Sequence, residues 1–600
     1  MKPTSDILER INQCSSAHQE GVFTRLYRYL LREDIYMIAY QKLYSNKGAL
    51  TKGTNEDTAD GFGYDYVKSI ICDLRNGTYK PTPLRRIYIP KRNGKKRPLS
   101  IPSFRDKLLQ EVIRMFLEAI YEPVFEDSSH GFRPNRSCHT ALKQITRECC
   151  GVPWFIEGDI HACFDCIDHK ILISVLERKI KDSKFINIIR LFLKCGYMED
   201  WTFNETYSGT PQGGICSPIL ANIYLNELDR KVREIAERLK GQNDTARPRR
   251  NPDYQKLYHK QALVSKEISE MEKGEDRDRK IREVKTLLKE RLGVSYFNNT
   301  DKGLTYVRYA DDWLIGVRGS KADCIAIKQE ISDFLKVELN LDLSEEKTLI
   351  THTTNKARFL GYDVTVNRCQ EARAYKCKNG RIKKQRSRNK RVLLLTPRKD
   401  RIMAFLFKKK AIVQKKDGRV VPLHRNDLIN KPDLEVVKTY NSEIRGILNY
   451  YSLASDYYWL SYFVYLMEYS CLKTLAAKHK TTVKKIISKY RDGHGWSIPY
   501  GTKIAPKRME IIKFSTFPKR FVSDDIKEYK FYGFKSSIWR RLQKDTCEVC
   551  GTKMQHKGKV HVVRRIKDLG YTPWELIMKE MRRKTLVVCP SCYGVIHAKG

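Results

Sequence analysis

The expected fold is decided by the stretch Tyr306-Val307-Arg308-Tyr309-Ala310-Asp311-Asp312-Trp313-Leu314-Ile315. Aromatic and β-branched residues on both sides of the two acids predict two strands joined by a tight turn. Both carboxylates then sit at the tip of the hairpin, where their repulsion is costly unless a cation neutralises it. Mg²⁺, a hard cation that prefers oxygen ligands, suits such a tip. For this pair alone a solvated Asp-Asp turn would be the better interpretation, so the rest of the chain has to decide.

A third acid lies far upstream, at the end of the apolar run Trp154-Phe155-Ile156-Glu157-Gly158-Asp159. Asp159 precedes Asp311 by 152 positions, so only the fold can unite them. Phe164 follows five residues later, and three further segments come in order: a Gly/Pro-rich loop ahead of an apolar helix at 208–218, then 343–348 and 358–362. In this order the segments resemble the palm motifs of reverse transcriptases, and five ordered matches are far more specific than any one of them.

Residues from about 20 to 600 resemble the group II intron-encoded proteins, the reverse transcriptase–maturases near the lactococcal type. The resemblance implies an α+β multidomain protein with a right-hand polymerase fold: fingers and palm with an antiparallel sheet, a helical thumb and a small zinc-binding C-terminal domain. It also implies an RNA-directed DNA polymerase encoded by a group II intron. Such an enzyme binds its intron RNA to promote splicing and performs target-primed reverse transcription during retrohoming.

The expected units follow from this resemblance and from shifts in composition. They are an N-terminal helical extension of the fingers at 1–80, fingers and palm at 81–365, a basic segment with the thumb (maturase domain X) at 366–500, a DNA-binding region at 501–540, and an HNH-like zinc domain at 541–600. Residues 230–293 are rich in charge at helical spacing and predict two exposed helices inserted into the palm. A generic linker remains an alternative for 501–540.

The resemblance assigns roles to the palm residues. Asp159, Asp311 and Asp312 match the catalytic triad that holds two Mg²⁺ ions. Phe164 matches the aromatic side chain that blocks a 2′-hydroxyl, with core packing as the alternative. Further nucleotide contacts are expected from Lys91, Arg97, Gln212, Gly213 and Lys347. Two of these assignments have alternatives: the Lys91 and Arg97 hairpin would touch only template backbone, and Lys347 would be an ordinary surface lysine.

The charge balance points to nucleic-acid partners. The chain has 114 Lys and Arg against 70 Asp and Glu, a net charge of +44, while 41% of its residues are hydrophobic. A folded protein with a dispersed basic excess attracts polyanions. We expect intron RNA, target DNA and dNTPs as partners, a homodimer as one assembly, no membrane association, and a bacterial cytoplasmic, nucleoid-associated ribonucleoprotein. Ten Lys or Arg and no acid between 373 and 391 add a polyanion-binding segment.

Three helical stretches follow the basic segment, at 434–451, 456–478 and 483–490. In the first, five apolar residues recur at helix spacing and predict core: Val436, Tyr440, Ile444, Leu448 and Tyr451. In the family this unit also grips intron RNA. The many tyrosines would suit base stacking, but packing is the more economical interpretation.

Two CxxC pairs near the end of the chain predict a structural zinc site. Cys547 and Cys550 are separated by 38 residues from Cys589 and Cys592. In a reducing compartment each pair clamps one side of a tetrahedral Zn²⁺, whereas a redox pair fits the small basic segment less well.

The same segment resembles the HNH endonuclease domain of intron proteins, but it departs from that pattern at the residues that carry the chemistry. Family members have two successive histidines, whereas this chain has His561 followed by Val562. Tyr593 stands where a histidine often follows the last cysteine, and His597 remains. Valine can neither accept a proton nor bind a metal, so we expect a degenerate HNH site with poor or lost cleavage.

Two other functions stay open from the sequence: a splicing-only RNA-binding maturase, and another bacterial reverse transcriptase of the retron or CRISPR-associated kind. The three palm acids disfavour the first. The thumb followed by a zinc segment disfavours the second.

Overall fold

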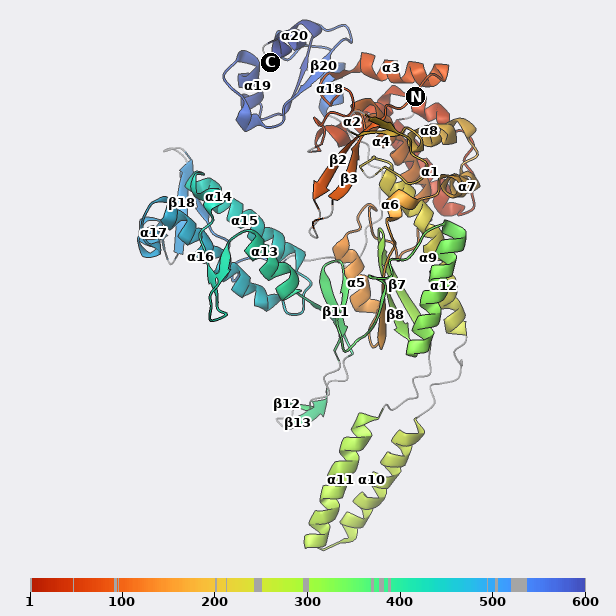
Figure 1. Ribbon diagram of the computed structural model, residues 1–600, viewed down its shortest axis with the longest axis vertical. Helices are drawn as coiled ribbons and strands as arrows, with labels where there is room; N and C mark the ends of the chain where they lie inside the picture. The colour runs from red at the N-terminus through yellow and green to blue at the C-terminus, as the bar shows by residue number, and fades with distance from the viewer. Residues whose placement is uncertain are drawn as a thin grey trace.

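The structure is a computed structural model that describes residues 3–598 apart from 47, 91–93, 95, 200–201, 212, 242–250, 273, 295–301, 368–371, 377–381, 387–389, 494, 502–505 and 520–536. Figure 1 shows a central region with one helical domain beside it, a small C-terminal domain above it and a helical hairpin projecting below it.

A four-stranded antiparallel sheet, the central sheet, carries the acidic residues. Its order is β7 (Gly303–Tyr309), β8 (Asp312–Arg318), β4 (Trp154–Asp159) and β9 (Leu349–His352). Side chains alternate between its two faces. Ile156 and Ile315 belong to one buried cluster, and Phe155 and Leu314 belong to the other. Both faces are therefore covered, which explains why these strands are apolar almost throughout.

The first half of the chain forms eight helices: α1 (Thr4–Ala17), α2 (Glu33–Tyr44), α3 (Tyr64–Asn76), α4 (Phe104–Tyr121), α5 (Cys138–Glu148), α6 (Cys163–Cys166), α7 (His169–Lys179) and α8 (Ser183–Leu193). Buried residues of α5 join the cluster that contains Phe155 and Leu314, and those of the other helices join the cluster that contains Ile156 and Ile315. We call α1 to α3 and their connections, residues 3–80, the N-terminal layer. It packs on α4, whose Ser103 N-cap hydroxyl accepts a hydrogen bond from the Asp106 amide.

A second sheet lies beside α4, with the order β3–β2–β5–β6. Its hairpin joins β2 (Leu84–Pro90) to β3 (Lys96–Ile101), and β5 (Tyr197–Glu199) pairs in parallel with β2 and antiparallel with β6 (Thr202–Asn204). Gly94 has φ +80° in the turn, which the expected Asn93-Gly94 signal requires. Asn93 and Lys91 lie outside the described residues.

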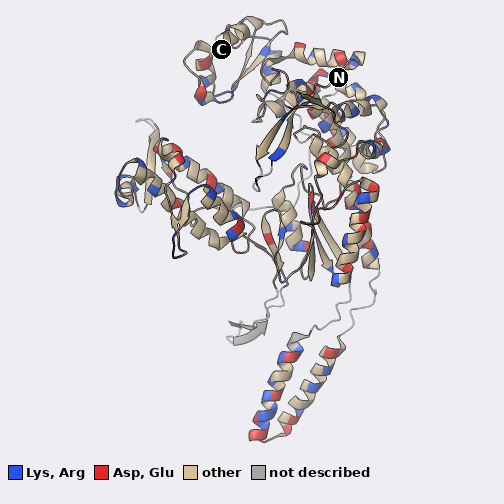
Figure 2. Ribbon diagram, in the orientation of Figure 1, with Lys and Arg blue, Asp and Glu red and all other residues tan. Residues whose placement is uncertain are grey.

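The charged insertion begins later than expected. α9 (Ser217–Gly241) continues through residue 230, and its Val232, Ile235 and Leu239 are buried, so 230–241 is part of the core. The exposed hairpin consists of α10 (Pro252–Glu270) and α11 (Glu275–Gly293). Figure 2 shows charges of both signs along the two helices, as expected for a solvated charged hairpin.

The chain after the central sheet builds a helical side domain, described over 392–519. Its elements, with the strands that lead into it, are β10 (Ala357–Phe359), β11 (Tyr362–Val366), β12 (Ala372–Lys376), β13 (Ile382–Arg386), β14 (Val392–Leu395), α13 (Ala404–Lys408), β15 (Ile412–Gln414), β16 (Val420–Pro422), α14 (Asn426–Ile429), α15 (Asp433–Tyr450), α16 (Leu460–Lys478), α17 (Val483–Lys489), β17 (Arg491–Asp492), β18 (Gly495–Gly501) and β19 (Pro506–Glu510). The preceding helix, α12 (Lys321–Leu339), packs instead on α9 and on β4 and β9 of the central sheet. The five-residue apolar stripe expected in α15 and at its end is buried, as predicted.

Hydrogen bonds to one carboxylate and the packing of two aromatic side chains stabilise this side domain. Asp433 accepts hydrogen bonds from Lys478, His479 and Tyr490. Burial pushes the pKa of Asp433 up, but these bonds outweigh it and bring that pKa down to about 2. Phe514 and Phe517, expected in a separate DNA-binding region, instead pack against the core of the side domain. Arg520 and Phe521 of that region lie outside the described residues.

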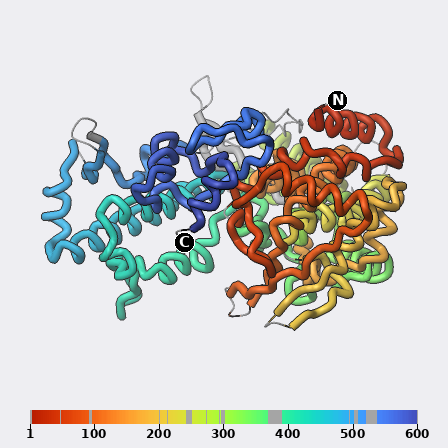
Figure 3. Tube along the Cα trace, turned by 90° about the horizontal axis from the view of Figure 1, so that it is seen from above, coloured from red at the N-terminus to blue at the C-terminus, as the bar shows by residue number. Residues whose placement is uncertain are grey.

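The C-terminal domain, residues 537–598, packs against the N-terminal layer. It contains α18 (Ser537–Gln543), β20 (Lys559–Val562), α19 (Pro573–Glu580), β21 (Thr585–Val588) and α20 (Pro590–His597). A strand from the N-terminal layer, β1 (Phe62–Gly63), completes the sheet β1–β20–β21. Figures 1 and 3 both show the C-terminal domain next to the N-terminal layer. Among the described residues, no helix combines the length and the apolar character that crossing a bilayer requires.

Candidate polymerase and metal sites

Strand register brings the three palm acids together. Asp159, the last residue of β4, pairs directly with Asp312, the first residue of β8, and Asp311 lies in the turn before it. Directly opposed residues of antiparallel strands have Cα atoms about 4.5–5.5 Å apart. Ala310 adopts φ +59° to make the turn. Two acids adjacent in sequence and one 152 positions earlier therefore share one edge of the sheet.

Their proximity perturbs their ionisation. Burial is the main reason that the pKa of Asp311 is raised, and the Asp159 charge adds to it. Burial, the charge of Asp311 and the hydrogen bond with Asp159 together raise the pKa of Asp312 to about 7. Asp311 and Asp312 thus resist ionisation unless positive charge is supplied. An all-oxygen donor set with this electrostatic demand fits Mg²⁺.

Lys347 supplies part of that charge. Its Nζ lies 2.6 Å from Asp159 Oδ2, although two-thirds of the side chain is exposed. This hydrogen bond is the main cause of the raised pKa of Lys347, so the ammonium is charged at neutral pH. The loop that holds Lys347 is fixed by the Ser344 amide, which donates to the Asp159 carbonyl at 2.9 Å.

A buried ion pair that sequence reasoning missed supports the acidic turn. Arg308 and Asp229 are both 0% exposed, and Arg308 donates to the Asp229 carboxylate at 2.7 and 2.6 Å. Arg308 also donates to the Ala310 carbonyl at 2.9 Å, which anchors the turn itself. Tyr306 donates to the same Asp229 carboxylate at 2.9 Å. Charged residues among apolar neighbours in a strand and a helix were the only signal available in the sequence.

Two glycines allow the backbone to approach this turn closely. A methyl group on Gly131 would meet the Ala310 amide nitrogen, and one on Gly158 would meet the Trp313 ring. Asn222 holds the Gly131 carbonyl with a hydrogen bond of 2.7 Å. Glycine at both positions is therefore required by packing against the strands that carry the acids.

Phe164 lies close to the acidic edge, on α6. It is half-buried, and its ring meets the ring of Phe132 edge-on with centroids 6.4 Å apart. Its carbonyl accepts a hydrogen bond from the Thr210 amide at 2.7 Å. The loop before α9 is thereby joined to the segment that carries Phe164.

The expected nucleotide-binding residues are only partly described. Gly213 has φ +116° and lies against the Ser100 carbonyl of β3, which excludes a side chain there. Arg97 is exposed on β3, and its positive charge opposes the rise in the pKa of Asp311. Lys91 and Gln212 lie outside the described residues.

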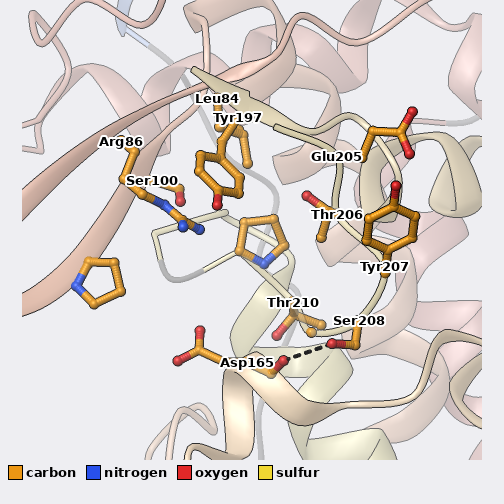
Figure 4. A pocket seen from close by; sticks show the side chains of 13 residues that line it. Leu84, Arg86, Ser100, Asp165, Tyr197, Glu205, Thr206, Tyr207, Ser208 and Thr210 are labelled. Atoms are coloured by element: carbon orange, nitrogen blue, oxygen red, sulfur yellow. Dashed lines mark hydrogen bonds between the residues drawn. The ribbon is translucent and has the colours of Figure 1, made fainter. Parts of the chain in front are cut away.

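A cavity of about 390 Å³ opens between the second sheet and the loop before α9. Figure 4 shows its walls: Arg86 and Tyr197 on one side, and residues 205–211 with Asp165 on the other. The Arg86 guanidinium lies 3.3 Å from the Tyr197 ring centroid, and the Ser208 hydroxyl donates to the Asp165 carbonyl at 3.2 Å. Asp165 adjoins Phe164, so the cavity borders the expected nucleotide site.

The side domain presents tyrosines on its surface. Tyr458, Tyr462, Tyr465 and Tyr469 are 80%, 41%, 48% and 39% exposed. The last three recur at helix spacing on α16, with ring centroids of Tyr465 and Tyr469 4.8 Å apart. Packing explains the tyrosines of α15 but not this row, which we call the α16 tyrosine row (Tyr462, Tyr465 and Tyr469).

The four cysteines of the C-terminal domain converge. Their sulfur atoms all lie within 4.8 Å of one another, and those of Cys550 and Cys589 are 3.8 Å apart. Tetrahedral Zn–S bonds of about 2.3 Å place two sulfurs about 3.8 Å apart. The donor set and its spacing therefore fit a closed zinc site.

The degenerate HNH residues lie beside an acid from the other end of the chain. His561 is buried on β20, His597 is half-exposed on α20, and Asp60 of the N-terminal layer contacts both. Val562 occupies the position next to His561 and offers only its backbone amide, which donates to Asp60. Asp60 was not singled out from the sequence, because nothing local marks it.

Comparisons with known proteins agree with this organisation. Residues 89–246 and 279–364 match the family described as reverse transcriptase (RNA-dependent DNA polymerase). Residues 389–534 match the type II intron maturase family, and 547–593 match the AI2M/AI1M-like HNH endonuclease family.

Full-length relatives are also found. The group II intron-encoded protein LtrA of Lactococcus lactis is 50% identical over 100% of both chains. An uncharacterised 91 kDa protein in the cob intron of Schizosaccharomyces pombe is 36% identical over 98% of this chain and 72% of its own. Among solved structures, a partial Cas6-RT-Cas1–Cas2 complex matches 52% of this chain and 43% of its own at 18% identity and a TM-score of 0.26. The full-length match and the three ordered domain families show that this chain belongs to the group II intron-encoded proteins and is an RNA-directed DNA polymerase with a maturase domain.

Proposed function

We propose that Asp159, Asp311 and Asp312 form the site at which this enzyme extends a DNA primer on an RNA template, using two Mg²⁺ ions. The observation that carries the proposal is the register of β4 against β8, which sets Asp159 opposite Asp312. When bound, Mg²⁺ supplies charge neutralisation at the attacking hydroxyl and the departing pyrophosphate. The chain itself holds the three carboxylates on a turn anchored by buried Arg308.

Primer extension on an RNA template tests this site. Asp311→Asn keeps the shape of the turn and removes one anionic ligand, so we expect a loss of about a thousandfold. The matched control is Asp253→Asn on the exposed helix α10, which should keep wild-type activity. Wild-type extension by Asp311→Asn would remove Asp311 from the catalytic site, whereas a wild-type protein that extends no primer would favour the splicing-only alternative.

Lys347 and Phe164 would act on the nucleotide. The Lys347 ammonium, 2.6 Å from Asp159, is charged and near enough to donate a proton to departing pyrophosphate. Phe164, beside the same edge, would exclude a 2′-hydroxyl. Phe164→Val should raise ribonucleotide use relative to deoxyribonucleotide use, and Phe164→Tyr should preserve the ratio. An unchanged ratio in Phe164→Val would leave Phe164 with a packing role only.

The arrangement supports a right-hand polymerase. The central sheet would be the palm, the β2–β3 hairpin with the N-terminal layer the fingers, and the helical side domain the thumb (Figure 1). We place the palm–insertion boundary after residue 241, because α9 is buried up to Leu239. We also extend the thumb to residue 519, because Phe514 and Phe517 pack on it.

Intron RNA would contact the thumb through the α16 tyrosine row. Exposed aromatic rings give stacking platforms, and the net charge of +44 favours the RNA backbone. Replacing the row by alanine (Tyr462→Ala, Tyr465→Ala, Tyr469→Ala) should weaken intron binding, since each stacked base is worth about 1–3 kcal/mol. Tyr571→Ala, at an 86% exposed tyrosine of the C-terminal domain, is the control. Equal RNA affinity in the two variants would remove the row from the interface.

Cleavage of target DNA by the C-terminal domain would be weak or absent. Val562 cannot act as a general base, and the histidine side chains beside it face Asp60. Protein–intron particles should therefore fail to nick the bottom strand of target DNA, and a nascent strand at a replication fork would serve as primer. Metal-dependent nicking by purified particles would overturn this.

A further inference from the structure

The C-terminal domain and the N-terminal layer share a sheet. Phe62 of β1 pairs with Val560 of β20, and the Gly61 amide donates to the Val560 carbonyl at 2.9 Å. A methyl group on Gly63 would meet the Gly558 carbonyl, so the backbones touch directly. Buried residues of both regions belong to one continuous apolar cluster. This junction brings Asp60 to the histidines of the C-terminal domain.

At the junction, three side chains from distant parts of the chain converge. Asp60 Oδ1 lies 3.1 Å from His561 Nδ1, and Asp60 Oδ2 lies 2.9 Å from His597 Nε2. One nitrogen from each histidine and one carboxylate oxygen all lie within 4.8 Å of one another. The set of two imidazoles and one carboxylate suits divalent first-row transition metals.

A second observation points to a ligand rather than to a simple ion pair. His561 is only 6% exposed, yet neither of its ring nitrogens has a hydrogen-bond partner among the described residues. Asp60 is close to Nδ1 but is not aligned with it as a hydrogen-bond acceptor. Tetrahedral bonds of about 2.0–2.1 Å to nitrogen and oxygen separate ligands by about 3.3 Å, close to the spacing seen here.

Two hydrogen bonds fix the orientation of the Asp60 carboxylate, as is common for carboxylates that bind a metal. The Val562 amide donates to Asp60 Oδ1 at 2.6 Å, and the Tyr593 hydroxyl donates to Asp60 Oδ2 at 2.9 Å. Such outer contacts fix the orientation of a ligating carboxylate. Tyr593, which replaces a histidine of the HNH pattern, therefore orients a ligand that comes from a different domain.

We propose that Asp60, His561 and His597 bind a divalent transition-metal ion that joins the C-terminal domain to the N-terminal layer. The HNH resemblance assigns the two histidines to a nuclease metal, but Asp60 lies nearly 500 residues before the matched segment at 547–593. Three protein ligands leave one position of a tetrahedral ion open, so the structural role rests on the ion joining side chains from the two regions and not on a closed shell. The site is separate from the four-cysteine site.

Metal content of the full-length protein tests the proposal. Wild type, loaded with Zn²⁺ and freed of excess by dialysis, should hold two zinc ions per chain. Asp60→Asn should hold one, because the amide replaces an anionic ligand while the four cysteines remain. His597→Ala, at a half-exposed position, should also hold one. The control Asp65→Asn, at an exposed position on α3, should hold two.

Hydrogen exchange at the junction gives an independent readout. Adding Zn²⁺ to metal-depleted Cys592→Ser, which lacks a complete four-cysteine site, should slow exchange in peptides covering β1 and β20. Adding it to Cys592→Ser combined with Asp60→Asn should not. One zinc ion per wild-type chain, or two in both Asp60→Asn and His597→Ala, would overturn the metal site and leave an ordinary ion pair.

Discussion

Neutralising Asp229 should loosen the strand pair that carries Asp311 and Asp312, two of the proposed catalytic acids. Asp229→Asn keeps the side-chain shape but removes the negative charge that faces Arg308, and both side chains are 0% exposed. Three hydrogen bonds end on the Asp229 carboxylate: two from Arg308, at 2.7 and 2.6 Å, and one from Tyr306, at 2.9 Å. Breaking a buried pair by removing one partner costs about 3–5 kcal/mol, because the remaining charge has no counter-charge.

That cost is a large part of a domain's stability, which is typically about 5–15 kcal/mol. We would measure it by hydrogen exchange in peptides covering 303–318, which contain β7 and β8. Since each 1.4 kcal/mol is tenfold, exchange through opening should accelerate by about a hundredfold to several thousandfold. Primer extension should fall as well, because the turn loses its rigid anchor at the Ala310 carbonyl.

Two variants show whether the reasoning is right. Glu330→Gln removes a partly exposed partner of Arg238 and Lys231 and should cost only about 0–1 kcal/mol. Asp229→Leu combined with Arg308→Met removes both buried charges and should regain much of the stability, yet not the activity, since Ala310 still lacks its donor. Exchange in Asp229→Asn as slow as in Glu330→Gln would refute the account of the buried pair.

Three further outcomes are expected. Gly131→Ala should lower primer extension by about a hundredfold, because the added methyl group displaces the Ala310 backbone. The control Gly446→Ala, whose methyl group meets nothing within 4 Å, should stay active, and equal activity of the two variants would exclude the close approach of Gly131 to Ala310. Asp433→Asn should lower the free energy of unfolding of the side domain, measured by denaturation at neutral pH. Because the folded-state pKa of Asp433 is lowered to about 2, the extra stability of the wild type is complete above about pH 4 and is lost as the pH falls towards 2. Extra stability that persists at pH 2 would contradict this. Chelation of zinc should abolish exchange protection across 541–598 while primer extension continues, and a C-terminal domain that stays protected without metal would contradict a structural role for the four cysteines.

Local sequence was enough to predict several elements of the central region and the side domain. The hairpin around Asp311, the apolar strand ending at Asp159 and the buried stripe of α15 all depend on side-chain periodicity, which is written in neighbouring residues. The spacing of the CxxC pairs likewise predicts a metal site. The bounds of helices were harder to predict from sequence. The helix α9 continues past residue 230 because three apolar residues in its charged half are buried in the core.

What tertiary structure alone decided is which distant groups meet. Sequence marked Asp159 as the end of a strand and Asp311 and Asp312 as the tip of a hairpin, but only the antiparallel register of β4 and β8 sets Asp159 opposite Asp312. Arg308 and Asp229 became a recognisable support only when both proved buried and in contact. Asp60 carries no local signal at all, and its place beside His561 depends on β1 joining the C-terminal sheet. The physical reason is common to all three: periodicity reports the environment of each segment, whereas contacts across hundreds of residues depend on how the segments pack.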